Sequence, residues 1–339
     1  MNRLEKYIIN NLSILFLSIF SALYTIASVI FLIKLATYTA IIQLSVWEMA
    51  KLYIFVVPEL LFFTLPITFF VAAALTIFRL SNDNELIVLF ALGIHPKFIL
   101  KTLFKPAFLL TLLLTFNFFV IFPHTKTLSK NFISYKKSEA KFNLAASEFG
   151  HKFGNWLLYL GKKNSDETYS DIFLFNKSEK EEVLISAKKA HIINNSGILR
   201  LKLTEGEGYS YSKEKFSQID FEIMYINDTF TSEIIPYKTT IDYWKELRGR
   251  DKKIPMFITD ILLSFFPVFS LFVVLSISVM HARHQKSKIY LYMFVSILVY
   301  YGATLSLQKA LVFYTIPVVS ILWLIVTYII YRKTILTRF

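Results

Sequence analysis

The sequence lacks cysteine and has few acidic residues. Among its 339 residues are 9 glycines, 9 prolines and no cysteine, and 24 Asp and Glu stand against 37 Lys and Arg. The absence of cysteine excludes disulfides, thiolate metal sites and cysteine nucleophiles. Charged residues make up only 18% of the chain, below the roughly 25% of soluble domains. This composition argues against a soluble globular protein.

Apolar residues are abundant instead. They form 55% of the chain, with 34 Phe and 19 Tyr, and a soluble protein of this length cannot bury so much apolar surface. Six runs with almost no charge approach or exceed the ~20 residues that cross a bilayer. These runs are residues 7–33, 52–78, 106–123, 261–280, 289–308 and 310–331. The sequence therefore predicts a polytopic α-helical membrane protein with six transmembrane helices, three on each side of a polar middle.

The charges are concentrated in that middle. Between residues 123 and 254 lie 22 of the basic and 18 of the acidic residues. The remaining basic excess lies at the ends of apolar runs, which is typical of membrane orientation and not of a nucleic-acid-binding face. The short loops richest in Lys and Arg share one side with both chain ends. By the positive-inside rule both termini are cytoplasmic and the middle is extracytoplasmic.

The chain is expected to divide at residues 1–123, 124–253 and 254–339. The middle segment begins as a helical connector and continues as short alternating runs that start near residues 156, 171, 197 and 216. We interpret Gly161, 194–197 and 206–208 as turns between them. The pattern predicts an inserted extracytoplasmic antiparallel β domain, either a sandwich, a β-jelly roll or a half-barrel.

Catalytic sequences are missing. No GxxxxGK[ST], HExxH or GxSxG pattern occurs. His281 and His284 have helical spacing but no nearby carboxylate or cysteine, so a solvated loop is favoured over a metal site. We expect a chain that is not an enzyme and that binds no metal or cofactor itself.

A short helix between the second and third apolar runs is the most informative segment. Residues 81–84 offer helix-start side chains, and Gly93 with Pro96 is expected to end a helix of about 83–93. It is too short to cross a bilayer. Its acids are Asp83 and Glu85, and one face carries Leu86, Leu89, Phe90 and Gly93. Such a helix either docks into a groove on a soluble partner or rests on the lipid interface, and both interpretations stay open.

Five short motifs, in this order and spacing, resemble the LptF/LptG (YjgP/YjgQ) permeases, and LptF more than LptG. They are Val57-Pro58-Glu59, Leu65-Pro66, Arg79-Leu80, Glu85-Leu86 and Ala91-Leu92-Gly93-Ile94. The resemblance implies one inner-membrane half of an ABC exporter that extracts lipopolysaccharide. Its implied partners are a second LptF/LptG-type permease, an LptB-like ATPase dimer that uses ATP and Mg, and periplasmic LptC and LptA-like proteins. Helix 83–93 would be the coupling helix, with Glu85 seated in the ATPase, and the first and fifth spans would form a lateral gate. The resemblance also implies that the outer domain is a β-jelly roll that hands lipid to LptC and then to LptA.

Two further groups of residues follow from this implied function. One is a set of lysines near the outer ends of spans, which either pair with headgroup phosphates or simply anchor the helices: Lys34, Lys126, Lys130 and Lys309. The other is a set of apolar β-domain residues, which either line a lipid path or form a closed core: Phe173, Phe175, Leu199, Leu201 and Leu203.

The alternative is a membrane-anchored scaffold or receptor whose periplasmic β domain binds a partner protein without transport. A receptor needs one anchor and has no use for a coupling-type helix, so six spans argue against it. A pull-down separates the two, because only a transporter half brings down a P-loop ATPase and a second six-span protein.

Overall fold

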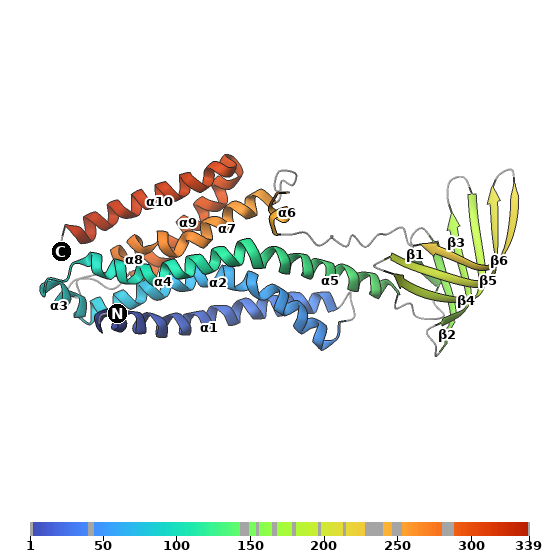
Figure 1. Ribbon diagram of the computed structural model, residues 1–339, viewed down its shortest axis with the longest axis horizontal. Coiled ribbons are helices and arrows are strands. Elements are labelled where there is room, and N and C mark those ends of the chain that lie inside the picture. The colour runs from blue at the N-terminus through green and yellow to red at the C-terminus, as the bar shows by residue number, and fades with distance from the viewer. Residues whose placement is uncertain are drawn as a thin grey trace. The chain divides into compact units, whose positions relative to one another are not determined.

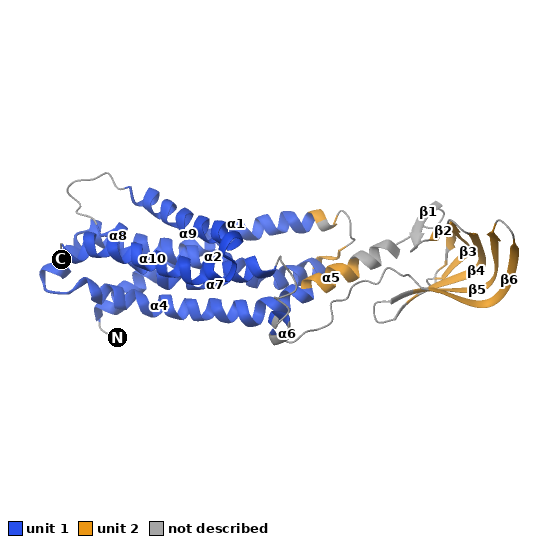
Figure 2. Cartoon of the chain, turned by 90° about the horizontal axis from the view of Figure 1, so that it is seen from above, with its two compact units in different colours: residues 1–36, 47–128, 237–339 blue, residues 37–46, 129–236 orange. Residues whose placement is uncertain are grey.

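The computed structural model contains long helices and one antiparallel sheet (Figure 1). It describes residues 3–39, 44–142, 149–153, 156–164, 168–177, 181–195, 198–212, 215–227, 240–245, 253–279 and 288–337. The chain divides into two compact units, coloured separately in Figure 2. Unit 1 comprises residues 1–36, 47–128 and 237–339, and unit 2 comprises residues 37–46 and 129–236.

The long helices follow the apolar runs of the sequence. They are α1 (Arg3–Thr39), α2 (Val46–Asn82), α4 (Pro96–Phe116), α5 (Phe122–Phe142), α7 (Lys253–Phe269), α8 (Leu271–Ser278), α9 (Ile289–Leu311) and α10 (Thr315–Tyr331). The short elements are α3 (Glu85–Ala91), α6 (Thr240–Lys245), the π-helices η1 (Asn117–Ile121) and η4 (Arg332–Leu336), and the 3-10 turn η3 (Val312–Tyr314). By length and composition, four helical stretches within the described residues suit a membrane span, or five when α7 and α8 count as one bent span.

The predicted fourth span is broken. Helices α7 and α8 meet at Ser270 with a bend of 47°. Pro267 lies one turn before the bend, where its ring removes a backbone donor and crowds the preceding turn. The Ser270 hydroxyl donates to the Pro267 carbonyl oxygen at 3.2 Å and satisfies one group at the break.

The last helical stretch, Ile289–Leu336, is 48 residues long and holds two of the predicted spans. At 1.5 Å per residue a straight helix of this length would measure about 72 Å, more than twice the thickness of the hydrocarbon core. The backbone turns at Val312, which has φ 47°. Helix α10 then packs against α7, α8 and α9 and ends on the side of unit 1 where α1 begins (Figure 1). Counted separately, α9 and α10 bring the spans to six.

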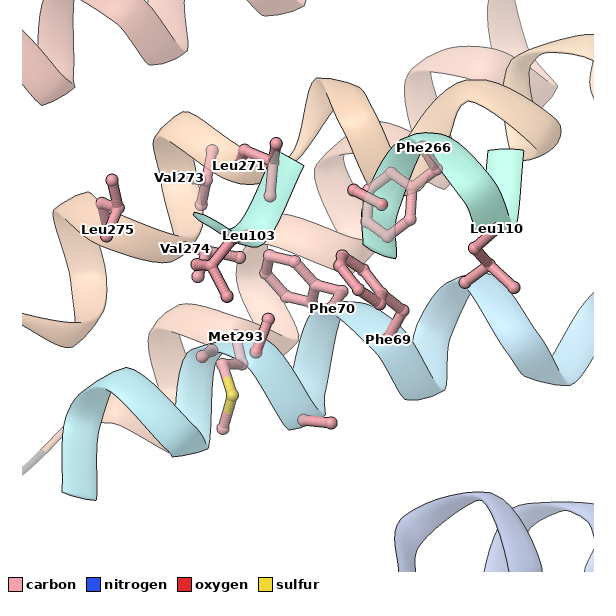
Figure 3. Packing of buried hydrophobic residues seen from close by; sticks show 14 of the residues in the cluster. Phe69, Phe70, Leu103, Leu110, Phe266, Leu271, Val273, Val274, Leu275 and Met293 are labelled. Carbon is pink, nitrogen blue, oxygen red and sulfur yellow. The ribbon is translucent and has the colours of Figure 1, made fainter. Parts of the chain in front are cut away.

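Unit 1 is built around large side chains from α2, α4 and α7 to α10. The ring centroids of Phe70 and Phe266 lie 5.4 Å apart, and those of Phe266 and Tyr300 lie 4.7 Å apart. Figure 3 shows Phe69 and Phe70 pointing from α2 into this cluster. The Tyr300 hydroxyl donates to the Leu262 carbonyl oxygen at 2.7 Å, so this fully buried ring also has a polar partner.

The sheet is a meander. Its strands are β1 (Phe149–Phe153), β2 (Trp156–Lys163), β3 (Thr168–Lys177), β4 (Glu181–Asn195), β5 (Ile198–Ser212) and β6 (Phe216–Asn227). They are antiparallel and lie in sequence order within one sheet, which curves in Figure 2. Among the three all-β arrangements left open by the sequence, the described strands match the half-barrel.

Buried side chains cover one face of this sheet, which we call the inner face. The face consists of the buried residues Leu158, Leu160, Tyr169, Ile172, Leu174, Ile185, Ala187, Ala190, Leu201, Leu203 and Ile226. Along the strands, the alternation of buried and exposed side chains shifts by one residue. The shift occurs at a row that crosses β3, β4 and β5 through Asp171, Lys188 and Glu205. Asp171 and Glu205 have φ near +55°, and the Lys188 ammonium lies 3.0 Å from a Glu205 carboxylate oxygen, which lowers the pKa of Glu205. The sheet is therefore creased along this row.

Two of the predicted turns are wrong. Gly161 lies inside β2, and Gly206 and Gly208 lie inside β5. A Cβ atom at Gly206 would overlap the Ser186 carbonyl oxygen and the ring of Phe221. Glycine is needed at this position because neighbouring strands approach closely at the crease, and not because the chain reverses.

Replacing Gly206 with alanine should therefore disrupt the sheet. Overpacking of this kind typically costs about 1–3 kcal/mol, so limited proteolysis of the full-length protein in detergent should cleave unit 2 of Gly206→Ala faster. Gly208→Ala is the matched control, because a Cβ there meets its nearest atoms only at 3.8 and 4.0 Å. Equal protection of the two variants would contradict the assignment.

Candidate functional site

Helix α3 has sharply defined ends. Asn84 precedes it in the left-handed conformation with φ 62°, and Gly93 follows it with φ 86°. The amide of Gly93 donates to the carbonyl oxygen of Phe90, and that of Ile94 to the carbonyl oxygen of Leu89, both at 3.0 Å. This is a Schellman ending, which requires a left-handed residue at the position of Gly93. The prediction that Gly93 ends the helix is confirmed, although the helix has two turns and begins at Glu85.

The helix buries the face that the sequence assigned to a partner. Leu86 is fully buried in the core of unit 1, and Leu89 and Phe90 pack against that core. The apolar side chains that α3 exposes are Val88, at 55% exposure, and Leu92, just after its end, at 74%. The surface open to a partner is therefore formed by Val88 and Leu92, while Leu86, Leu89 and Phe90 attach the helix to its own bundle.

The two acids at the head of α3 have different surroundings. Asp83 is exposed and lies 3.9 Å from Arg79 in an i,i+4 pair. Glu85 is half-buried and accepts a hydrogen bond at 3.0 Å from the hydroxyl of Tyr7, on α1. Sequence reasoning missed Tyr7, because a tyrosine at the start of a long apolar run is also an ordinary interfacial residue.

One cavity of about 390 Å³ lies on the sheet, and another pocket lies beside α3. This pocket, of about 330 Å³, is lined from α1 by Leu4, Tyr7 and Ile8, and from the α2–α3 segment by Leu80, Asp83, Asn84, Glu85, Val88 and Leu89. A smaller pocket of about 110 Å³ lies on the other side of the Tyr7–Glu85 pair and includes the polar residues Asn11, Thr76 and Arg79. The hydrogen-bonded pair thus separates an apolar pocket from a polar one.

The start of α1 has a second polar attachment. The Lys105 ammonium, on α4, lies 3.1 Å from both carboxylate oxygens of Glu5, and the Glu5 side chain is only 13% exposed. Glu5 and Tyr7 are two residues apart, so the first turns of α1 are bonded to both α3 and α4. Neither residue stood out in the sequence.

Of the four predicted headgroup lysines, Lys126 has the most structured surroundings. Its ammonium lies 3.4 Å from Glu59 on α2 and 4.9 Å from the centre of the Phe122 ring. The buried Asp260 on α7 interacts electrostatically with both Lys126 and Glu59. Lys34, Lys130 and Lys309 are exposed.

The predicted lipid-path residues of the sheet do not share one face. Leu201 and Leu203 are buried on the inner face. Phe173 is 43% exposed and pairs with Ser186, between the inward-facing Ile172 and Leu174, so it lies on the opposite face. Phe175 pairs with the exposed Leu184 and also lies there. The side chain of Leu199 is outside the described residues.

An aromatic cluster joins α6 to the third and fourth spans. The Trp244 indole donates to the Phe119 carbonyl oxygen at 3.1 Å, in the π-helix η1. Its ring lies 4.7 Å from Phe118 and 5.3 Å from Phe257. A tryptophan isolated in a charged segment was the only signal in the sequence.

Within the residues that the structure describes, no group of three or more His, Asp or Glu is arranged to hold a metal. The pair His281 and His284 lies outside those residues. The contacts described at this site are hydrogen bonds, ion pairs and apolar packing.

The sequence was compared with known families and proteins. One family, described as Lipopolysaccharide export system permease LptF/LptG, matches residues 6–332. No curated protein matches the chain. The family match spans nearly the whole chain, from Lys6 on α1 through the sheet and α10 to Arg332. This chain therefore belongs to the LptF/LptG family of lipopolysaccharide export permeases and is a membrane transport subunit rather than an enzyme.

Proposed function

We propose that this chain is the LptF-like half of an ABC exporter that extracts lipopolysaccharide from the inner membrane. An LptB-like ATPase dimer supplies ATP hydrolysis with Mg, and a second LptF/LptG-type permease completes the membrane part. Both termini are cytoplasmic in this proposal, and the sheet is periplasmic, where it passes lipid to LptC and LptA-like proteins. The observation that carries the proposal is α3, a two-turn helix anchored by Leu86 that exposes Val88 and Leu92.

The attachment of α3 is suited to transmitting force. A helix lying loosely on lipid would slide when pushed, but the fully buried Leu86 and the packed Leu89 and Phe90 fix α3 to unit 1. The exposed Val88 and Leu92 are left for a groove on the ATPase. The α3 helix also lies on the same side of unit 1 as the start of α1 and the end of α10, where a cytoplasmic ATPase would meet it (Figure 1).

The sheet supports the proposed lipid path and the proposed hand-over. Its inner face is apolar from β2 to β6, and this face offers acyl chains a continuous apolar surface. Among the described strands, β6 is an edge strand bonded only to β5, so one row of its backbone groups is open to pairing with a strand of a following protein.

Labelling of a single cysteine tests the orientation. The chain contains no natural cysteine, so Leu92→Cys gives one thiol on the exposed end of α3. In intact cells it should react with a membrane-permeant maleimide and not with an impermeant one, and co-expression of the ATPase should slow the reaction several-fold by covering the site. Tyr225→Cys, on an exposed position of β6, is the control and should react with both reagents in cells whose outer membrane is permeabilised. Reaction of Leu92→Cys from the periplasmic side would exclude the exporter.

Charge reversal at Glu85 tests the coupling. Glu85→Lys should leave the protein inserted but lower lipid release per ATP hydrolysed by about tenfold or more, because the positive side chain loses both the Tyr7 hydroxyl and its seat in the ATPase. Reconstituted complexes allow both rates to be measured. Glu222→Lys makes the same reversal on an exposed position of the sheet and should release lipid at the wild-type ratio. Full lipid release by Glu85→Lys, with normal ATPase recovery, would refute the coupling role.

A photo-crosslinking amino acid tests the lipid path. At Leu203, on the inner face, it should form a lipopolysaccharide adduct that depends on ATP. At Phe173, on the opposite face, it should form several-fold less. Equal adducts at the two positions would show that the inner face is a closed core.

A further inference from the structure

Helix α1 is the least supported of the long helices. Its most apolar 18-residue window has no buried residue, whereas 67% of the corresponding window of α2 is buried. Along its length α1 exposes Ile14, Leu17, Ile26, Val29, Ile30, Leu32 and Ile33. In a membrane these side chains exchange one apolar neighbour for another at little cost. The span of α1 can therefore shift without disrupting the core of unit 1.

The start of α1 is attached differently. Ile8 and Leu12 are buried in the core, Glu5 is paired with Lys105 on α4, and the Tyr7 hydroxyl is bonded to Glu85 on α3. The last contact is special because it joins α1 directly to the proposed coupling helix.

Two pockets flank this bond between α1 and α3. Leu4 and Ile8 on α1 and Val88 and Leu89 on α3 line the 330 Å³ pocket together, so side-chain packing between the two helices leaves space there. A smaller pocket of 110 Å³ is also lined by Tyr7 and Glu85. Between these pockets the Tyr7 side chain, which is 45% exposed, donates to the Glu85 carboxylate, and hydrogen bonds to charged acceptors are stronger than neutral ones.

We propose that Tyr7 is a positioning residue for Glu85, and that the bond between its hydroxyl and the carboxylate makes α1 move together with α3 during transport. The proposal rests on the proposed function, in which α3 receives the motion of the ATPase. It adds that α1, and not only the packed core, is driven directly by that motion. Loss of the hydroxyl alone then separates ATP hydrolysis from the movement of α1.

The first test removes only this hydroxyl. Tyr7→Phe keeps the ring that lines both pockets and should leave recovery of the ATPase and the rate of ATP hydrolysis within about twofold of wild type. Lipid released per ATP should fall about tenfold, the effect of losing one charge-assisted hydrogen bond. The double variant Tyr7→Phe/Glu85→Lys should be no worse than Glu85→Lys alone, because both changes break the same link.

The matched control lies on the same helix. Tyr24, also on α1, accepts a hydrogen bond at 3.1 Å from the Tyr53 hydroxyl on α2. Tyr24→Phe thus makes the same chemical change in another contact of α1, away from α3. It should release lipid at the wild-type ratio.

A second measurement reports the motion itself. Because the chain has no cysteine, spin labels can be placed on Leu4→Cys on α1 and Val88→Cys on α3, both of which line the larger pocket. In the reconstituted complex the distance between the labels should stay constant between the nucleotide-free and ATP-bound states. With Tyr7→Phe added, the distance should change or broaden on ATP binding.

The outcomes are distinct. If Glu85→Lys uncouples but Tyr7→Phe releases lipid at the wild-type ratio, the role of Tyr7 is refuted and the exporter stands. If the label distance changes on ATP binding with Tyr7 intact, α1 does not move with α3 and the inference is also refuted. If Glu85→Lys itself has no effect, the coupling role of α3 fails, and the inference fails with it.

Discussion

The contact between α4 and α7 is the one on which the rest of the chain depends. These helices lie on either side of the long polar insertion in the sequence, yet they pack directly on each other in unit 1. Their packing brings together the points where the chain leaves for the sheet and where it returns. Loop-closure entropy grows only slowly with length, so an insertion of this size is tolerated once its ends are fixed. The aromatic cluster of Phe118, Trp244 and Phe257 lies at that junction.

Apolar surroundings impose a second constraint, because polar groups inside such a bundle have no water to bond. Several hydroxyls donate to the carbonyl four residues before them, as Thr64, Thr68 and Thr76 do along α2. Charged groups in the bundle also have partners within the chain. Lys126 pairs with Glu59, and the buried Asp260 interacts electrostatically with both. A lysine in this environment is tied to acids of its own chain, so a lipid phosphate must compete with Glu59 to reach it. That competition makes Lys126 a less available headgroup partner than an exposed lysine.

The sequence predicted the membrane class, the position of the insertion and the end of α3 at Gly93, because long apolar runs and Gly93 are local signals. It could not assign the faces of β3, since Phe173 and Leu174 are both apolar and a period of two fits either choice. It misread Gly206 because the need for glycine comes from the neighbouring strands, where the Ser186 carbonyl oxygen and the Phe221 ring approach closely, and this contact depends on the pairing register and not on the local sequence. It also assigned the wrong face of α3 to a partner. Apolar residues lie on both sides of this helix, and the tertiary contact of Leu86 decides which side is buried. Tyr7 was missed because its partner lies 78 residues away.

The distribution of burial among the helices carries a mechanical consequence. α2, with α4 and α7, forms a dense centre in which any displacement disturbs many side chains, and close-packed cores resist such changes. α1 buries none of its most apolar window, and the stretch that holds α9 and α10 buries 17% of its window. Lipid tails are as apolar as these side chains, so a peripheral helix gains little by keeping one neighbour over another. A large amphiphile entering sideways from the membrane would meet the least resistance beside such helices. In the mechanism that we propose, the helix that costs least to move is the one that moves, and it therefore has to be bonded firmly at the end where force arrives.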